Sequence, residues 1–135
     1  MQVIDFIKAN GGNINSVTDA FGIKVKEYND GIRPNLYVLN YSQIDSPKME
    51  PIVKECRGLI LDESLNVICR PFDRFFNLGE ADTDKLDLSK FVFAPKLDGS
   101  LIKVYHWYGC WRIATRGTAF AESDVGDWGI TFEKL

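Results

Sequence analysis

The stretch Gly58-Leu59-Ile60-Leu61-Asp62-Glu63-Ser64-Leu65-Asn66-Val67-Ile68-Cys69-Arg70 decides the fold class of this 135-residue chain. Its first four residues form an apolar run, which predicts a buried strand. The polar segment 62–66 predicts a turn, and Val67–Arg70 predicts a strand that returns beside the first. Pro71 closes the second strand, because proline has no N–H to donate to a neighbour. The stretch therefore predicts a pair of antiparallel strands.

Patterns on both sides extend this pair into a larger domain. Helical spacing of apolar residues predicts short helices over Met1–Ala9 and Val17–Phe21. The polar, acidic segment Ala81–Lys90 predicts a short helix or a loop. The further segments that predict strands are Ile23–Tyr28, Leu36–Tyr41, Phe91–Phe93, Leu101–Trp107 and Trp111–Thr115. We therefore expect one α+β domain over residues 1–135, with a mainly antiparallel sheet and a few short helices.

Composition and charge are those of a soluble globular chain and exclude several function classes. Hydrophobic residues make up 45% of it, but no apolar run is long enough to span a bilayer. A net charge of −3 argues against a protein that grips nucleic acid over its whole surface. The single histidine, His106, argues against a zinc site or a histidine-based catalytic pair. Cys56, Cys69 and Cys110 lack metal-ligand or disulfide spacing, which indicates reduced thiols in the cytoplasm.

The segment Lys96-Leu97-Asp98-Gly99-Ser100 is the sharpest candidate for chemistry. It lies between two predicted strands, so we expect a tight loop that directs the Lys96 amine into a cleft. Gly99 permits a backbone conformation that other residues resist, or the close approach of a ligand. A neutral lysine amine can attack the α-phosphate of ATP when cations neutralise the triphosphate. The alternative is a hairpin turn with a solvated lysine, since Asp-Gly is common in such turns.

Other segments occur in order around this motif: ECRGLILD at 55–62, RPFDRFFNLGE at 70–80 and ATRGT at 114–118. The series resembles the phage-type ATP-dependent RNA ligases, which belong to the covalent nucleotidyltransferase superfamily with DNA ligases and mRNA-capping enzymes. The resemblance runs from about Asn40 to Thr118. The lysine motif is shared by the whole superfamily, whereas the first two segments are more particular to RNA ligases. The resemblance implies the N-terminal part of an adenylyltransferase domain, a partial nucleotidyltransferase fold of the ATP-grasp-like ligase type.

The resemblance also implies a role for each matching residue. Lys96 matches the lysine that becomes adenylylated, and Arg57 matches a basic residue placed against the ATP phosphates. Arg74 stands where the family has a basic residue near the nucleotide, and arginine can bind phosphate bidentately. The other nucleotide-binding residues implied are Phe76, Asp98, Gly99 and Arg116.

The three arginines also have plainer interpretations. Arg57 can form a surface ion pair with Glu55, and Arg74 can form one with Asp73. Arg116 can belong to an ordinary turn.

The resemblance further implies ATP and Mg²⁺ as cofactors and RNA ends, such as those of a cleaved tRNA, as partners. The family's active site continues downstream with a strand glutamate, a Glu-Gly strand motif and a final Lys-x-Lys motif. We find none of these after Arg116, so we expect the chain to stop within the nucleotide-binding domain. A truncated gene product, one half of a split enzyme completed by a second chain, and a small relative without catalysis all explain this.

Three functions follow. The first is an RNA ligase fragment: Lys96–AMP forms, AMP passes to an RNA 5′-phosphate, and that end is joined to a 3′-hydroxyl. The second is a module that binds nucleotide or RNA without chemistry. The third is an interaction domain in which the motif is a coincidental turn. In each case we expect no metal site built from the chain's own residues, no membrane contact, and a cytoplasmic location, in the host if the protein is viral.

Overall fold

The computed structural model describes residues 1–29, 31–80, 83, 85, 87–132 and 134. It confirms the α+β class with antiparallel sheets and short helices. No helix within these residues is long and apolar enough to cross a membrane. The helices are α1 (Gln2–Ala9), α2 (Ser16–Phe21), α3 (Pro51–Glu55) and the 3₁₀ helix η1 (Leu88–Lys90). The strands are β1 (Lys24–Tyr28), β2 (Leu36–Asn40), β3 (Arg57–Asp62), β4 (Val67–Cys69), β5 (Lys103–Trp107) and β6 (Cys110–Ala114).

The strands form two antiparallel sheets. Four of them lie in the order β1-β2-β3-β4, and β5 pairs with β6 as a separate two-stranded sheet. The β3–β4 pair is the one that the sequence predicts, and Asp62 closes its turn by accepting hydrogen bonds from the backbone N–H groups of Ser64 and Asn66. A register shift falls between Leu39 and Asn40 at the end of β2. This irregularity places Asn40 opposite Arg57, at the edge of the site described below.

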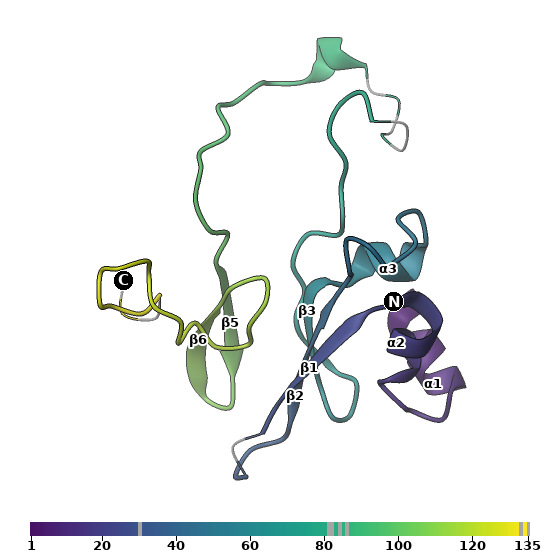
Figure 1. The fold of residues 1–135 in the computed structure, drawn as a ribbon, viewed down its shortest axis with the longest axis vertical. Helices are drawn as coiled ribbons and strands as arrows, with labels where there is room; N and C mark the ends of the chain where they lie inside the picture. The colour runs from purple at the N-terminus through teal and green to yellow at the C-terminus, as the bar shows by residue number, and fades with distance from the viewer. Residues whose placement is uncertain (30, 81–82, 84, 86, 133, 135) are drawn as a thin grey trace.

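The central strands of the four-stranded sheet, β2 and β3, are buried on both faces. Leu39, Leu59 and Leu61 pack with apolar residues of the three α-helices. Val38 and Ile60 face the other way and pack with residues of β5 and β6. Figure 1 shows this arrangement, with the helices on one side of the sheet and the β5–β6 hairpin on the other. Burial on both faces explains why Gly58–Leu61 is a continuous apolar run and does not alternate.

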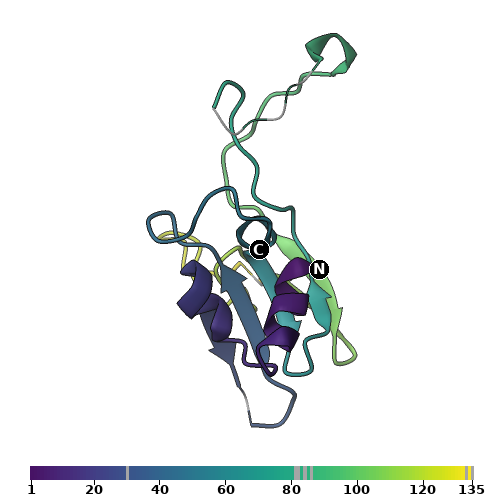
Figure 2. The ribbon, with the colours of Figure 1, turned by 90° about the vertical axis from the view of Figure 1, so that its right-hand side faces the viewer.

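A long excursion separates β4 from β5. The chain leaves the body after β4, carries η1 at its far end and returns to β5 (Figures 1 and 2). Residues 91–100, on the returning limb, are all exposed and lie outside helices and strands. The predicted strand Phe91–Phe93 is therefore wrong. Its residues have strand-forming side chains but lack a neighbouring strand to pair with, and Val92 is 97% exposed.

Two other expectations change. Lys96 does not lie in a tight loop between two strands, because the strand predicted before it is absent and β5 begins only at Lys103. Pro51–Glu55 forms a helix that the sequence did not predict. In Ala81–Lys90, residues 81, 82, 84 and 86 lie outside the described part, and the described remainder contains η1.

Candidate functional site

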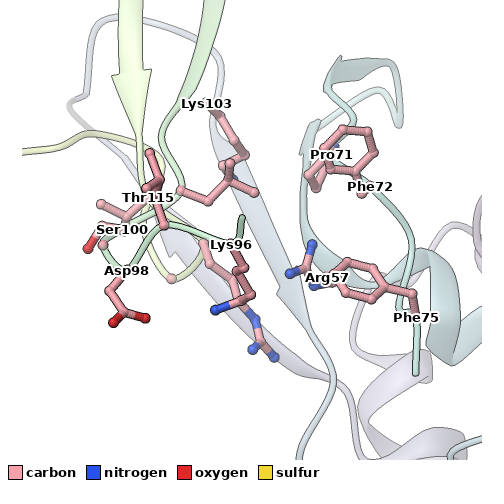
Figure 3. Close-up of a pocket in the computed structure, with 14 residues that line it drawn as sticks. Arg57, Pro71, Phe72, Phe75, Lys96, Asp98, Ser100, Lys103 and Thr115 are labelled. Atoms are coloured by element: carbon pink, nitrogen blue, oxygen red, sulfur yellow. The ribbon is translucent and has the colours of Figure 1, made fainter. Parts of the chain in front are cut away.

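A cavity of about 750 Å³ lies where the excursion meets the two sheets. Its walls come from the start of β3, both limbs of the excursion, the start of β5 and the loop after β6. Figure 3 shows Arg57 and Phe75 on one side of the hollow and Lys96, Asp98 and Ser100 on the other. Its lining residues are Arg57, Pro71, Phe72, Phe75, Lys96–Leu101, Lys103 and Thr115–Gly117.

This cavity brings together five of the seven site residues that the sequence predicts. Lys96, Asp98 and Gly99 line it from the returning limb, while Arg57 and Arg116 line it from the body of the domain. Arg74 and Phe76 are not among its lining residues. Phe75, the neighbour that the sequence analysis did not select, is the aromatic that lines it. The returning limb thus completes a site whose other walls come from the outgoing limb, the two sheets and the loop after β6.

Arg57 is the first residue of β3 and is held by an aromatic ring. Its guanidinium carbon lies 4.8 Å from the centre of the Phe75 ring, within range of a cation–π interaction. Glu55 is engaged elsewhere: its carboxylate accepts hydrogen bonds from the backbone N–H groups of Gln2 and Val3, at the start of α1. The alternative ion pair between Arg57 and Glu55 is therefore not formed in the structure. The Arg57 guanidinium stays available on the cavity wall.

Arg74 and Arg116 contact the same buried tyrosine. The guanidinium carbons of Arg74 and Arg116 lie 4.2 Å and 4.5 Å from the centre of the Tyr41 ring. Among the described residues, the buried Nη1 atom of Arg74 has no hydrogen-bond partner. Asp73, proposed above as its ion-pair partner, instead pairs with Arg70 at 3.3 Å. A buried guanidinium nitrogen without a partner is costly.

Asn40 holds the Arg116 loop through two hydrogen bonds. Its Nδ2 atom donates a hydrogen bond of 3.0 Å to the Arg116 carbonyl oxygen, and Arg116 Nε donates one of 3.4 Å to Asn40 Oδ1. Asn40 is the last residue of β2, beside the register shift, and sequence patterns gave no sign of this role.

Lys96 and Gly99 lie on the exposed limb. The Gly99 backbone has a φ of +143°, a value that side-chain-bearing residues rarely adopt. This confirms the conformational half of the expectation for Gly99. A Cβ atom there would meet nothing within 4 Å, so the described residues impose no close approach. The Lys96 side chain projects into the hollow shown in Figure 3.

Lys103 is a cavity-lining residue that the sequence analysis missed. It is only 8% exposed, and its Nζ donates a hydrogen bond of 2.6 Å to the Gly58 carbonyl oxygen. Burial lowers its pKa to about 8, and the nearby Cys69 opposes this shift. A signal was present in the sequence: Lys103 shares the inward face of its strand with Tyr105 and Trp107, so the alternation places a lysine at a core position.

The charges on the cavity wall suit an anionic ligand. Among the described lining residues, four carry basic side chains (Arg57, Lys96, Lys103 and Arg116) and one, Asp98, carries a carboxylate. Within the described residues, no group of three or more His, Cys, Asp or Glu side chains is placed to hold a metal ion. The arrangement can bind a phosphate-rich ligand beside a lysine amine.

Comparison with known proteins shows to which family the chain belongs. The model of the family described as RNA ligase matches residues 55–128, which include β3, the excursion and the β5–β6 hairpin. The chain belongs to the RNA ligase family. The RNA ligase match covers more than half of the 135 residues and contains every cavity-lining residue.

A relative of this chain is the putative bifunctional polynucleotide kinase/RNA ligase of Autographa californica nuclear polyhedrosis virus. The two are 44% identical over 147 residues, an alignment that covers 100% of this chain and 20% of that protein. The chain therefore spans about a fifth of the length of the curated relative that it matches.

Proposed function

We propose that this chain forms part of the active site of an ATP-dependent RNA ligase and that Lys96 is the residue that carries AMP. The observation that carries this proposal is the clustering of three other basic side chains around the cavity that Lys96 lines. Arg57 and Arg116 would bind the phosphates of ATP, and Arg74, which packs on the same Tyr41 ring as Arg116, would add positive charge near them. Phe75 or Phe76 would pack beside the nucleotide.

The first step would be a phosphoryl transfer to nitrogen. The neutral Lys96 amine attacks the α-phosphorus of ATP, the bond between that phosphorus and the bridging oxygen breaks, and pyrophosphate leaves. The amine gives its proton to solvent, and a lysine–AMP phosphoramidate results. Such a reaction depends mainly on positioning and on neutralising the charge of the transferred group and the leaving group. The basic residues of the cavity wall supply both.

Magnesium would enter with the nucleotide. Mg²⁺ usually keeps several waters and binds through one or two carboxylates together with substrate phosphates. The described cavity lining offers one carboxylate, that of Asp98. The lining fits a magnesium–ATP complex that binds as substrate: Asp98 would help to hold the ion, and the ion would offset phosphate charge.

The RNA steps would follow on the same site. AMP would pass from Lys96 to an RNA 5′-phosphate, and a 3′-hydroxyl would then displace AMP and seal the strand. The RNA ligase named in the viral relative supports an RNA substrate for this chain. A second polypeptide or a further segment would supply the downstream motifs of the family. We also propose that the protein acts inside the cell, for example in RNA repair in a virus-infected cell.

Labelling with α-³²P ATP and magnesium tests the first step. The wild-type protein should acquire a covalent label that survives denaturation, and Lys96→Ala should lose it while keeping its fold, because Lys96 is exposed. Lys90→Ala is the matched control, since Lys90 is also exposed on the excursion but pairs with Asp87 at 3.3 Å. A label that persists in Lys96→Ala would place the nucleophile on another residue.

One observation favours a second function, the binding of nucleotide without chemistry. Arg57 and Arg116 lie at the sheets, whereas Lys96 lies on a limb without helix or strand. A folded protein that binds ATP but gains no label would support this alternative. A folded protein that neither binds ATP nor gains label would support the third possibility, a domain that uses this surface only for interaction.

A further inference from the structure

The buried amine of Lys103 lies at the point where three segments of the site converge. It donates its 2.6 Å hydrogen bond to Gly58, the residue that follows Arg57 in β3. A Cβ atom on Gly58 would lie 2.6 Å from the Arg116 carbonyl oxygen and 3.2 Å from Lys103 Nζ. The Gly58 backbone therefore lies beside both the Arg116 backbone and the Lys103 amine, with no room for a side chain between them. Arg57 and Arg116, the two arginines on the cavity wall, both extend from this contact.

A lysine at this buried position costs free energy, because its amine must be removed from water. The inward face of β5 otherwise carries Tyr105 and Trp107, and an apolar residue in place of Lys103 would avoid the cost of burying an amine. The hydrogen-bond acceptor found for Lys103 is a carbonyl, so its charge is not offset by a carboxylate partner at that bond. Departures of this kind from ordinary core patterning occur at functional sites.

We propose that Lys103 is a positioning residue of the ligase site, whose amine holds the Gly58 carbonyl and thereby keeps Arg57 and the Arg116 loop in place around the triphosphate. The proposal rests on the proposed function, since it assumes that ATP binds in this cavity. Lys103 acts through its neighbours: it fixes the Gly58–Leu59 peptide that directly follows Arg57 in β3, and because Gly58 lies close beside the Arg116 backbone it also supports the loop. It also adds positive charge to the wall on which the phosphates would lie.

The charge state of Lys103 would couple to ATP binding. The charged or titratable groups around it are Cys69 on β4, Arg57 on β3, Arg116 after β6, and Lys96 and Asp98 on the returning limb. The pKa of Lys103 is about 8 in the free protein, so the amine loses its charge within an accessible pH range. A bound triphosphate favours the protonated amine, and the affinity for ATP should therefore fall as the pH rises through about 8.

Titration of ATP–magnesium into the protein between pH 7 and pH 9.5 tests this inference. Lys103→Met should bind ATP about tenfold more weakly at pH 7, which is the size expected when a charged hydrogen bond is lost. It should also lack the fall in affinity near pH 8. Lys103→Arg should recover part of the affinity and also lack that fall, since arginine stays protonated throughout. Lys8→Met is the matched control, because it removes the same charge from an exposed position on α1, away from the cavity, and should keep the wild-type profile.

The outcomes separate this inference from the proposed function. If Lys103→Met binds ATP as tightly as the wild type with an unchanged pH profile, the positioning role is overturned while ATP binding stands. If Lys103→Met does not fold, Lys103→Arg decides: a folded Lys103→Arg protein with the wild-type fall near pH 8 also overturns it. If the wild-type protein binds no ATP, both the proposed function and this inference are overturned.

Discussion

Asn40 and Arg116 exchange two hydrogen bonds across 76 positions of sequence. Asn40 Nδ2 donates to the Arg116 carbonyl oxygen at 3.0 Å, and Arg116 Nε donates to Asn40 Oδ1 at 3.4 Å. Asn40 is also the register partner of Arg57 across the β2–β3 pair. Asn40, at the end of β2, thus lies between the two arginines that we propose as phosphate ligands: it is hydrogen-bonded to Arg116 and paired in register with Arg57.

Replacing Asn40 with alanine should weaken ATP binding without unfolding the protein. The change removes both hydrogen bonds to Arg116, and we expect the dissociation constant for ATP to rise about three- to tenfold. Asn35→Ala is the control, because Asn35 also makes a side-chain hydrogen bond, but its partner Glu27 does not line the cavity. Equal affinity in the two variants and the wild type would mean that Arg116 needs no support from Asn40.

Gly58→Ala should be strongly destabilising. The Gly58 backbone has a φ of +83°, and a Cβ there would lie 2.6 Å from the Arg116 carbonyl oxygen. Gly109→Ala offers a matched comparison, since Gly109 has a φ of +79° and nothing within 4 Å of a Cβ. Chemical denaturation should give a loss of about 1 kcal/mol for Gly109→Ala and about 3 kcal/mol or more for Gly58→Ala. Similar losses would show that the Arg116 loop moves freely away from Gly58.

Arg57→Ala should weaken ATP binding more than it lowers stability. The half-buried Arg57 guanidinium packs on Phe75 at the cavity wall, and we expect removal of a phosphate contact to cost about 1.5–3 kcal/mol of binding free energy. Arg70→Ala is the control, because Arg70 lies outside this cavity and pairs with Asp73. Calorimetric titration of both variants measures the difference. An Arg57→Ala protein with wild-type affinity would reduce Arg57 to a support for Phe75.

The pH dependence of stability should carry a contribution from Lys103. Burial lowers its pKa from 10.5 to about 8, so between these pH values the unfolded chain holds a proton that the folded chain has released. The free energy of unfolding therefore gains from Lys103 as the pH rises over this window. Cys56 acts in the opposite sense above pH 9, because burial raises its thiol pKa from 9.0 to about 12.

Comparison with Lys103→Met isolates the lysine contribution, since Cys56 is common to both proteins. The stability of the wild type relative to Lys103→Met should increase from pH 8 toward pH 10.5 in urea denaturation. Parallel pH profiles for the two proteins would mean that the Lys103 amine keeps an ordinary pKa in the folded state.

Local sequence patterns were sufficient for most of the strands. The β3–β4 pair and the β5–β6 hairpin were predicted because their apolar runs and turn residues act over a few positions. Phe91–Phe93 has the same local character, but a strand also needs a partner to accept and donate its backbone hydrogen bonds, and whether one lies alongside is a property of the whole fold. The helix Pro51–Glu55 was missed for a related reason: it depends on tertiary packing, because Val53 of α3 is buried in the same core cluster as residues of α1.

The sequence by itself determined the α+β class, the order of the motifs and the family, because these depend on which residues follow one another. It also identified Lys96, Arg57 and Arg116, which line one cavity in the folded chain. Only the tertiary structure decided that Asn40 holds Arg116 and that the Lys103 amine holds Gly58. The physical reason is that a hydrogen bond depends on distance in space. The partners lie 76 and 45 positions apart in the chain, and no local pattern records that folding brings them within 3.0 Å and 2.6 Å.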